Sequence, residues 1–271
     1  MASQILILGT SGDALVTGKH YLSAGGILLK FDDKVFLLDP GPGCISDAGR
    51  MGLSLRELTA VFISHRHLNH SGDLNAVVSA MTLGGLDKKG VLVSCKDVVL
   101  GEPEKGIYPV LDPYYRSAVE KFIVLDEKGK LAINDIDVFP TKTIHSCENL
   151  GFKFFSSDFS VGYTSDTQYS QEIAKQYAGC DVLIINVQNP QGISKEGLMN
   201  TDDCIKFAKD ARPSILLLTH FGIKMINANV ISQARLIKQE TGVETIAAKD
   251  GFLLEPLSYG LKGTQKTLSH F

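Results

Sequence analysis

The 271-residue sequence has no tryptophan, no CxxC pair and no apolar run close to the roughly 20 residues that a membrane-spanning helix needs. Its first four residues lack the basic and apolar regions of a signal peptide, so no export is expected. The five cysteines stand far apart, at positions 44, 95, 147, 180 and 204, which is typical of free thiols in a reducing compartment. We therefore expect a cytoplasmic protein that does not enter the membrane.

Positive charge is also sparse and scattered along the chain. The sequence has 27 Lys and Arg residues against 30 Asp and Glu residues, a formal net charge of −3. No basic tract or aromatic-interleaved basic stripe is present, so charge does not support a nucleic-acid partner. With 44% hydrophobic residues, the composition is typical of a globular protein with an ample core. A small-molecule substrate fits this composition better than a polyanion.

Short apolar runs punctuated by glycine predict strands over residues 5–8, 25–31, 35–38, 60–64, 91–94, 118–125, 131–139, 150–155, 159–163, 182–187, 215–219 and 252–257. Apolar spacing of three and four residues, with start signals, predicts helices over 45–58, 72–83, 168–177, 201–209 and 228–240. Residues 102–115 read as irregular. Because the elements alternate without a linker or repeat, we expect one α/β domain over residues 1–271, with two sheets inside and helices outside.

One segment carries most of the recognisable chemistry. Residues 64–73 read Ser-His-Arg-His-Leu-Asn-His-Ser-Gly-Asp, directly after the apolar stretch 60–63. Neutral imidazole is the commonest protein ligand of transition metals. His65 and His67 are two residues apart, so in an extended loop they point the same way and can share an ion. The segment predicts a metal that activates water for attack on an electrophile.

Four more polar residues follow predicted strands, where the sites of layered α/β proteins usually lie: Asp39, His145, Asp166 and His220. Simpler roles exist for two of them, because Asp39 reads equally well as a turn residue and Asp166 as the cap of the following helix. Five histidines that share this strand-end context with two aspartates favour metal binding. Only His20 and His270 fall outside the set.

This ordered set resembles the metallo-β-lactamase superfamily. The family's first motif is HxHxDH, which here reads His65-x-His67-x-Asn69-His70. The remaining motif positions are matched, in family order, by Asp39, His145, Asp166 and His220. Segments 9–12, 197–203 and 219–222 are most similar to the tRNase Z and cyclic-phosphodiesterase branch. The resemblance implies a four-layer αββα sandwich, α/β or α+β in class, with metal bound between the sheets, and a homodimer.

The resemblance also implies a role for each motif residue. The first ion would be held by His65, His67 and His145. The second would be held by His70 and His220 with the residue at position 69, and Asp166 would bridge the two ions. Asp39 would orient a histidine or a loop. The implied metal is Zn²⁺, as one or two ions, with Mn²⁺ or Fe²⁺ as alternatives.

Asn69 is the one departure from the motif, because the family has an aspartate there. An amide oxygen can coordinate a cation, but it brings no negative charge and cannot act as a base. The second ion would therefore be held more weakly. Asn69 is an engineered inactivating change, an adaptation to a different metal load, or the mark of a lineage that lost hydrolysis. We favour a natural variant that retains some metal.

Three functions follow. The first is hydrolysis of a phosphodiester by a metal-bound hydroxide, with Asn69, Asp166 and His220 as the catalytic candidates. The second is hydrolysis of a carboxylic ester, thioester or lactone by the same hydroxide. The third is a metal-binding protein without turnover, for which Asn69 is the argument. Proton delivery to the leaving group would come from solvent, or from Asp73 or His220.

Other features read more simply. Cys147 follows His145 closely, and a buried structural thiol is the preferred interpretation over a metal ligand. Residues 9–12 lack the lysine of a P-loop and are expected to form a tight turn at the rim of the cleft. Tyr108, Tyr114 and Tyr115 read equally as a substrate lid or as an ordinary packed loop.

Overall fold

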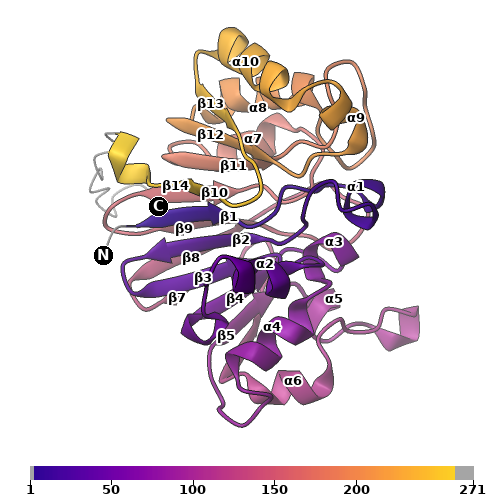
Figure 1. Ribbon diagram of the computed structural model, residues 1–271, viewed down its shortest axis with the longest axis vertical. Helices are drawn as coiled ribbons and strands as arrows, with labels where there is room; N and C mark the ends of the chain where they lie inside the picture. Colours follow the sequence, from indigo (N-terminus) through magenta and orange to yellow (C-terminus); the bar gives the residue numbers. More distant parts are fainter. Residues whose placement is uncertain (1–2, 260–271) are drawn as a thin grey trace.

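Two sheets stacked face to face, with helices on both outer faces, form the architecture of the computed structural model, which describes residues 3–259 (Figure 1). The first sheet has the strand order β14-β1-β2-β3-β4-β5-β6 and the second the order β13-β12-β11-β10-β9-β8-β7. The predicted αββα sandwich is confirmed.

The strands of the first sheet are β1 (Gln4–Ile7), β2 (Ile27–Phe31), β3 (Lys34–Leu38), β4 (Ala60–Ile63), β5 (Val91–Ser94), β6 (Lys121–Val124) and β14 (Phe252–Leu254). Those of the second are β7 (Leu131–Ile133), β8 (Ile136–Thr141), β9 (Gly151–Phe155), β10 (Ser160–Tyr163), β11 (Val182–Asn186), β12 (Ile215–Thr219) and β13 (Glu244–Ala247).

The helices of the first half are α1 (Ala14–Gly18), α2 (Cys44–Arg50), α3 (Leu68–Ser71), α4 (Leu74–Met81), α5 (Lys96–Val99) and α6 (Pro113–Ala118), with short 3₁₀ turns η1 (Leu55–Glu57) and η2 (Pro103–Lys105). The second half adds α7 (Gln171–Gln176), α8 (Thr201–Ala211), α9 (Ile223–Asn227), α10 (Val230–Thr241) and the 3₁₀ turn η3 (Pro256–Tyr259). Within residues 3–259, none of these helices is both long and apolar enough to cross a bilayer.

Several phenylalanines contact one another in the apolar core between the two sheets. Phe36 and Phe62 come from the first sheet, and Phe152 and Phe154 from the second, and all four are fully buried. Phe62 contacts Phe154 edge to face, with ring centroids 5.0 Å apart. One apolar cluster includes the inner faces of both sheets, which favours a single domain over residues 1–271; that assignment stays a prediction.

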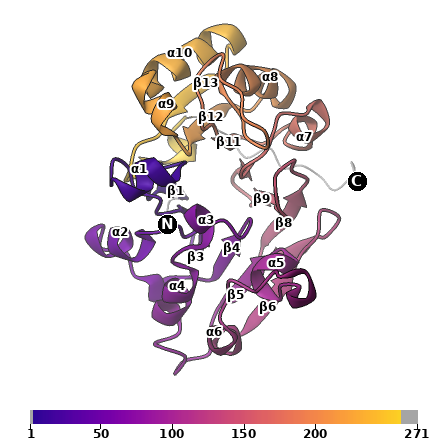
Figure 2. The ribbon, with the colours of Figure 1, turned by 90° about the vertical axis from the view of Figure 1, so that its right-hand side faces the viewer.

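Strand direction gathers the chemistry at one edge of the sandwich. In the first sheet β3 and β4 run parallel, and in the second sheet β10, β11 and β12 run parallel. Because parallel strands end at the same edge, polar residues that follow them in sequence become neighbours in space. The helices α1 and α3 flank this edge, at the right of Figure 1 and towards the viewer in Figure 2.

Several predicted elements were wrong in detail. The strand expected over 131–139 is a hairpin, because Asn134 has a left-handed φ of 55° and turns β7 back as β8. The helix expected over 45–58 ends at Arg50, and the region 102–115 contains the start of α6, which opens on Pro113 with Asp112 as its cap. The short elements β13 and α9 were missed, since four or five residues carry little periodic signal.

Candidate metal centre

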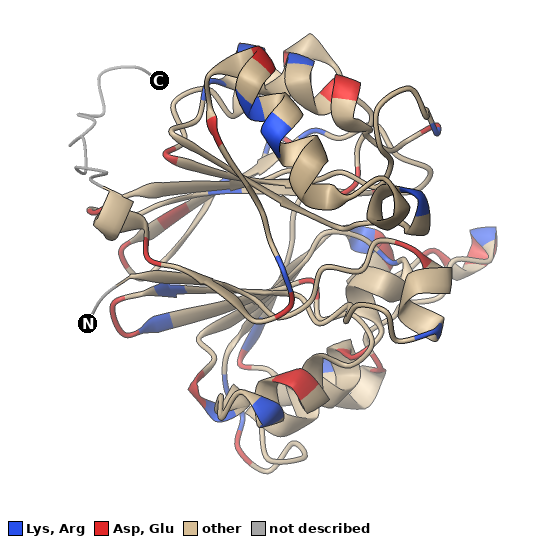
Figure 3. Cartoon of the chain, turned by 45° about the horizontal axis from the view of Figure 1, so that its top comes forward, with Lys and Arg blue, Asp and Glu red and all other residues tan. Residues whose placement is uncertain are grey.

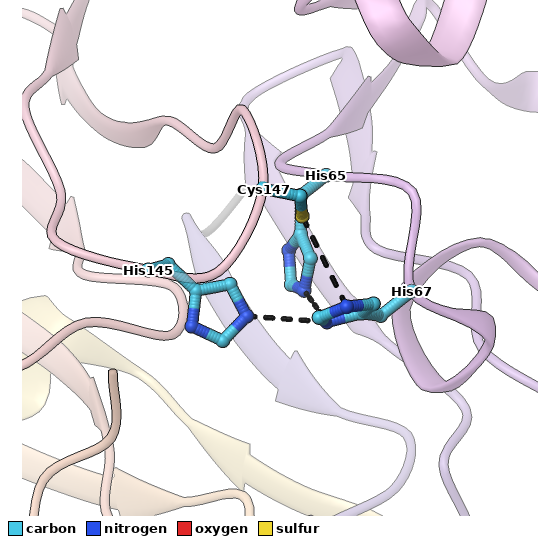
Figure 4. Close-up of side chains that lie close together, drawn as sticks. All are labelled: His65, His67, His145 and Cys147. Carbon is cyan, nitrogen blue, oxygen red and sulfur yellow. Dashed lines mark hydrogen bonds between the residues drawn. The ribbon is translucent and has the colours of Figure 1, made fainter. Parts of the chain in front are cut away.

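Three imidazoles face one another at the end of β4. The Nδ1 atom of His67 lies 3.0 Å from Nε2 of His65 and 3.1 Å from Nε2 of His145 (Figure 4). Tetrahedral zinc with Zn–N bonds of about 2.0–2.1 Å separates two nitrogen ligands by roughly 3.3 Å. The three nitrogens are therefore close to the spacing that a single ion imposes.

Hydrogen bonds behind two of these rings orient their lone pairs. The Nδ1–H of His145 donates to the carbonyl of Gly197 at 2.9 Å, so Nε2 of that ring carries the lone pair. Ser64 donates its hydroxyl to Asp39 and contacts Nδ1 of His65 at 2.9 Å, so it accepts from that nitrogen. Both Nε2 atoms are thus left as acceptors directed at the space between the rings.

A second group of ligand-type residues adjoins the first. Asp166 lies between them, because its Oδ2 is 3.3 Å from Nε2 of His70 and 4.0 Å from the Nε2 atoms of both His65 and His145. Its Oδ1 is 3.4 Å from Nδ1 of His220. Within residues 3–259 that buried Nδ1 has no hydrogen-bond partner, which is costly for a polar atom and is consistent with a nitrogen that binds a metal ion.

Asn69 belongs to the second group. Its amide nitrogen lies 2.8 Å from Nε2 of His220. Rotating the amide by 180° exchanges nitrogen and oxygen, so this geometry equally presents the amide oxygen to the same point. All seven residues of the motif therefore converge: His65, His67, Asn69, His70, His145, Asp166 and His220.

Asp39 supports the centre from behind. Its carboxylate accepts the backbone N–H and the hydroxyl of Ser64, both at 2.6 Å, and the hydroxyl of Tyr163 at 2.7 Å. It also lies 2.8 Å from Nδ1 of His70, whose Nε2 is thereby directed at Asp166. These contacts favour the orienting role for Asp39 over that of a simple turn residue.

Sequence reasoning missed three residues that hold Asp166 and Asp39 in place. Asn186 donates to Oδ1 of Asp166 at 2.8 Å, Asn149 donates to its backbone carbonyl, and Tyr163 donates to Asp39. Asn186 ends the apolar strand β11, the same signal that identified His220 after β12. For Asn149, no comparable signal exists, because it is brought in by an isolated β-bridge to His65.

The backbone is strained where it presents these side chains. Asp39, Ser165 and His220 all have left-handed φ values, of 47°, 54° and 66°. Each costs about 1–2 kcal/mol for a residue with a Cβ, and such strain persists where surrounding contacts enforce it. Gly12 packs against one of these positions so closely that a Cβ there would lie 2.0 Å from the carbonyl oxygen of His220.

Burial and charge shift several pKa values strongly. Burial lowers the pKa of His65 well below its usual value, and it lowers that of His220 to about 4. Burial alone would lower the pKa of His70 as well, but the carboxylates of Asp166 and Asp39 raise it to about 10. Burial would raise the pKa of Asp166, but the charges of His220 and His70 hold it well below its usual value. His65 and His220 are therefore neutral beside an ionised Asp166, whereas His70 is protonated and would release its proton when a divalent cation binds.

The first group opens into a cavity of about 600 Å³. Its wall includes four residues of the motif, together with Gly12 and Leu68: His67, Asn69, His145 and Asp166. Lys195 brings a positively charged side chain to the cavity wall, and its ammonium donates to Gln188 at 3.3 Å. The wall also includes apolar residues: Ala14, Pro42, Leu68 and Leu198. Gly12 at the wall fits the tight turn expected at the rim.

Three further residues or segments were considered for the site from the sequence, and none of them lines the main cavity among the described residues. Asp73 was wrong as a proton donor, because its carboxylate accepts the backbone N–H groups of Gly43 and Ile45 at 3.1 Å and is absent from the cavity wall. Tyr114 donates to the carbonyl of Gly84, and the tyrosines of this loop are not among the described residues that line the cavity, so the structure favours an ordinary loop over a substrate lid. The expectation of a buried thiol at Cys147 was wrong, because Cys147 is half-buried whereas the other four cysteines are buried. Its thiol lies beside the histidines of the first group.

Similarity to known proteins agrees with this geometry. Residues 34–221 match the model of the beta-lactamase superfamily domain. An uncharacterized protein of Methanocaldococcus jannaschii is 30% identical over 261 residues, which cover 95% of this chain and 97% of that protein. A ribonuclease Z of Borreliella burgdorferi is 24% identical over 220 residues, covering 80% of this chain and 63% of that enzyme.

Among solved structures, the metallo-beta-lactamase fold protein YhfI of Bacillus subtilis superposes with a TM-score of 0.76 at 21% identity, covering 93% of this chain and 98% of that one. The predicted resemblance and the predicted fold are both confirmed. A histidine-rich donor set on this fold indicates a divalent metal.

Proposed function

This chain belongs to the beta-lactamase superfamily as a metallo-hydrolase with the metallo-β-lactamase fold, and from that membership we propose that it hydrolyses a small phosphodiester. The observation that carries the proposal is the convergence of five histidines, Asp166 and Asn69, of which His67, His145, Asp166 and Asn69 line a 600 Å³ cavity that also presents Lys195. Metal ions, when bound, would activate water and neutralise charge that develops on the substrate. We assign Zn²⁺ as the metal, as one or two ions.

The residues of the site would have two roles, as ligands of the two ions and as groups that orient those ligands. His65, His67 and His145 would hold the first ion, and Asp166 would contact both ions. His70, His220 and Asn69 would hold the second. Asp39 orients His70 through its 2.8 Å hydrogen bond, and Gly197 orients His145 through its carbonyl. Orientation of this kind is what keeps ligand lone pairs directed at one point.

Substrate size and charge are argued from the cavity. A volume of 600 Å³ lies within the range of about 300–1,000 Å³ typical of small-molecule sites. Lys195 carries a positive charge at this wall and would attract a phosphodiester anion. In Figure 3, segments of Lys and Arg alternate with segments of Asp and Glu on the helices of both outer layers, and the sequence carries 27 basic against 30 acidic residues, so charge does not favour folded RNA. The relationship to ribonuclease Z supports phosphodiester chemistry while the charge favours a smaller substrate.

The residues at the cavity wall also determine which groups could protonate the leaving group. Asp13 lines the wall, but its carboxylate accepts the backbone N–H groups of Val16 and Ile223 at 2.8 Å and so serves as a cap. His220 is 6% exposed and belongs to the second group. Leu198 and Leu68 occupy wall positions without a transferable proton. His20, Lys195 and Glu196 also line the wall and carry exchangeable protons, so protonation of the leaving group would come from one of these side chains or from solvent.

The experiment is turnover of bis(p-nitrophenyl) phosphate by the full chain, purified without chelator and assayed with added Zn²⁺ or Mn²⁺. We expect metal-dependent release of p-nitrophenolate that is abolished in His145→Ala. His20→Ala is the histidine control, because His20 lies outside the ligand set; it should retain bound metal and turnover, and its place in the cavity wall affects KM alone. Inertness of both the natural chain and Asn69→Asp, with metal bound, would contradict the proposal.

Hydrolysis of an ester, thioester or lactone is the second candidate, and the apolar part of the wall favours it. Ala14, Pro42, Leu68 and Leu198 offer contact for an acyl chain rather than for a phosphate. A parallel screen with p-nitrophenyl esters, thioesters and lactones at matched concentration decides between the two. Turnover of acyl substrates alone would replace the phosphodiester assignment.

A further inference from the structure

Cys147 differs from the other cysteines of the chain. Cys44, Cys95, Cys180 and Cys204 are buried, whereas Cys147 is only half-buried. It reaches the first group of histidines from the side of a separate hollow of about 280 Å³, which Cys147 and His145 both line. The main cavity has His145 in its wall but not Cys147. His145 therefore separates the two hollows, with the thiol of Cys147 on one side and the substrate cavity on the other.

The thiol of Cys147 lies close to the three histidines of the first group. Its Sγ lies 4.0 Å from Nε2 of His67, and Figure 4 shows the side chain pointing towards that ring. One donor atom each from His65, His67, His145 and Cys147 lies within 4.8 Å of every other. In a tetrahedral zinc site, with Zn–S of about 2.3 Å, sulfur and nitrogen ligands are separated by roughly 3.6 Å. His67 faces His65 and His145 with Nδ1 and faces Cys147 with Nε2, so the thiol has to turn towards Nδ1 to share the ion.

We propose that Cys147 is a further protein ligand of the ion held by His65, His67 and His145, beside the shared carboxylate of Asp166. The inference rests on the metal centre proposed above and adds to it a soft, anionic donor. When the ion binds, the thiol loses its proton to solvent and the thiolate coordinates. Beside three imidazoles, Asp166 would share its single negative charge between the two ions, and the thiolate would supply one further negative charge to the first.

This ligand changes how the two ions are held. At position 69 an amide replaces a carboxylate, so the second ion loses one negative charge. At position 147 a thiolate adds one to the first ion. We therefore expect strongly unequal affinities, with a first ion that is thiophilic, such as Zn²⁺ or Co²⁺, and tightly bound. The second ion would be loosely bound and exchangeable.

The test uses full-length protein loaded with a single equivalent of metal. With Co²⁺ we expect a near-ultraviolet thiolate-to-cobalt charge-transfer band that Cys147→Ser loses, while the visible cobalt bands from the histidines remain. With Zn²⁺, X-ray absorption of the unaltered chain should show one sulfur at about 2.3 Å. Competition with a chromophoric chelator should show affinity for the first ion lowered at least about tenfold in Cys147→Ser, because even residues behind the ligands contribute that much.

Cys204→Ala is the matched control, since Cys204 is buried in α8 and should leave the band unchanged. Zinc bound with only nitrogen and oxygen neighbours, or a cobalt spectrum identical in Cys147→Ser, would overturn the inference while leaving the metal centre standing. A chain that binds no metal would overturn both. The X-ray measurement needs no variant, so it decides even where Cys147→Ser fails to fold.

Discussion

Restoring the missing carboxylate should strengthen the second metal site. The change is Asn69→Asp, at a position whose amide lies 2.8 Å from Nε2 of His220 and so beside the ligands His70 and Asp166. Asparagine and aspartate have the same shape, and the change therefore alters charge and basicity with little effect on packing. The centre already accommodates the side chain, so no backbone movement is needed.

The magnitude follows from charge. Two unit charges 4 Å apart attract by about 4 kcal/mol at an effective dielectric constant of 20, and a dication attracts more strongly. Desolvation of the new carboxylate and competition from water offset much of this attraction. We expect a net gain of about 2.8 kcal/mol, which corresponds to roughly 100-fold tighter binding of the second ion. The first ion should be nearly unaffected.

Stepwise titration with Zn²⁺ or Mn²⁺, followed by calorimetry and by metal analysis after gel filtration, measures the two affinities separately. Hydrolysis of bis(p-nitrophenyl) phosphate should rise in parallel at limiting metal. Asn134→Asp is the control, because it adds the same charge in the exposed β7–β8 turn, where asparagine and aspartate both tolerate a left-handed φ. A second-site affinity that changes less than about threefold in Asn69→Asp would refute the electrostatic reasoning.

Three further changes test other parts of the structure. Gly12→Ala should weaken the second ion and lower the melting temperature, because its Cβ would lie 2.0 Å from the carbonyl oxygen of His220; Gly18→Ala, with nothing within 4 Å, should be silent in both measurements. Lys195→Ala should raise KM for a phosphodiester about fivefold with little change in kcat, since an exposed charge contributes roughly 1 kcal/mol; an unchanged KM removes Lys195 from substrate binding. Phe62→Ala should lower the free energy of unfolding by about 3–5 kcal/mol in urea titrations, against a much smaller loss for the half-exposed Phe122→Ala, and equal losses would contradict the buried inter-sheet contact.

Much of the site could be predicted from the sequence, because its ligands belong to one simple pattern. His65, Asp166 and His220 each follow an apolar strand by one to three residues. Once those strands are parallel within their sheets, their ends share an edge, and the polar residues after them have to meet. Element types were likewise predictable wherever a strand or helix ran long enough for its period to show, as in β11, β12 and α8.

Other features were decided only by tertiary contacts. The bond from Asp39 to His70, the bridge from Asn149 to His65 and the approach of Cys147 to His67 join residues that are far apart along the chain or lie on different sheets. A sequence determines which groups are available and the local direction of the backbone that carries them. The distances between those groups depend on how two sheets stack on their shared phenylalanine core, and no local pattern contains that packing.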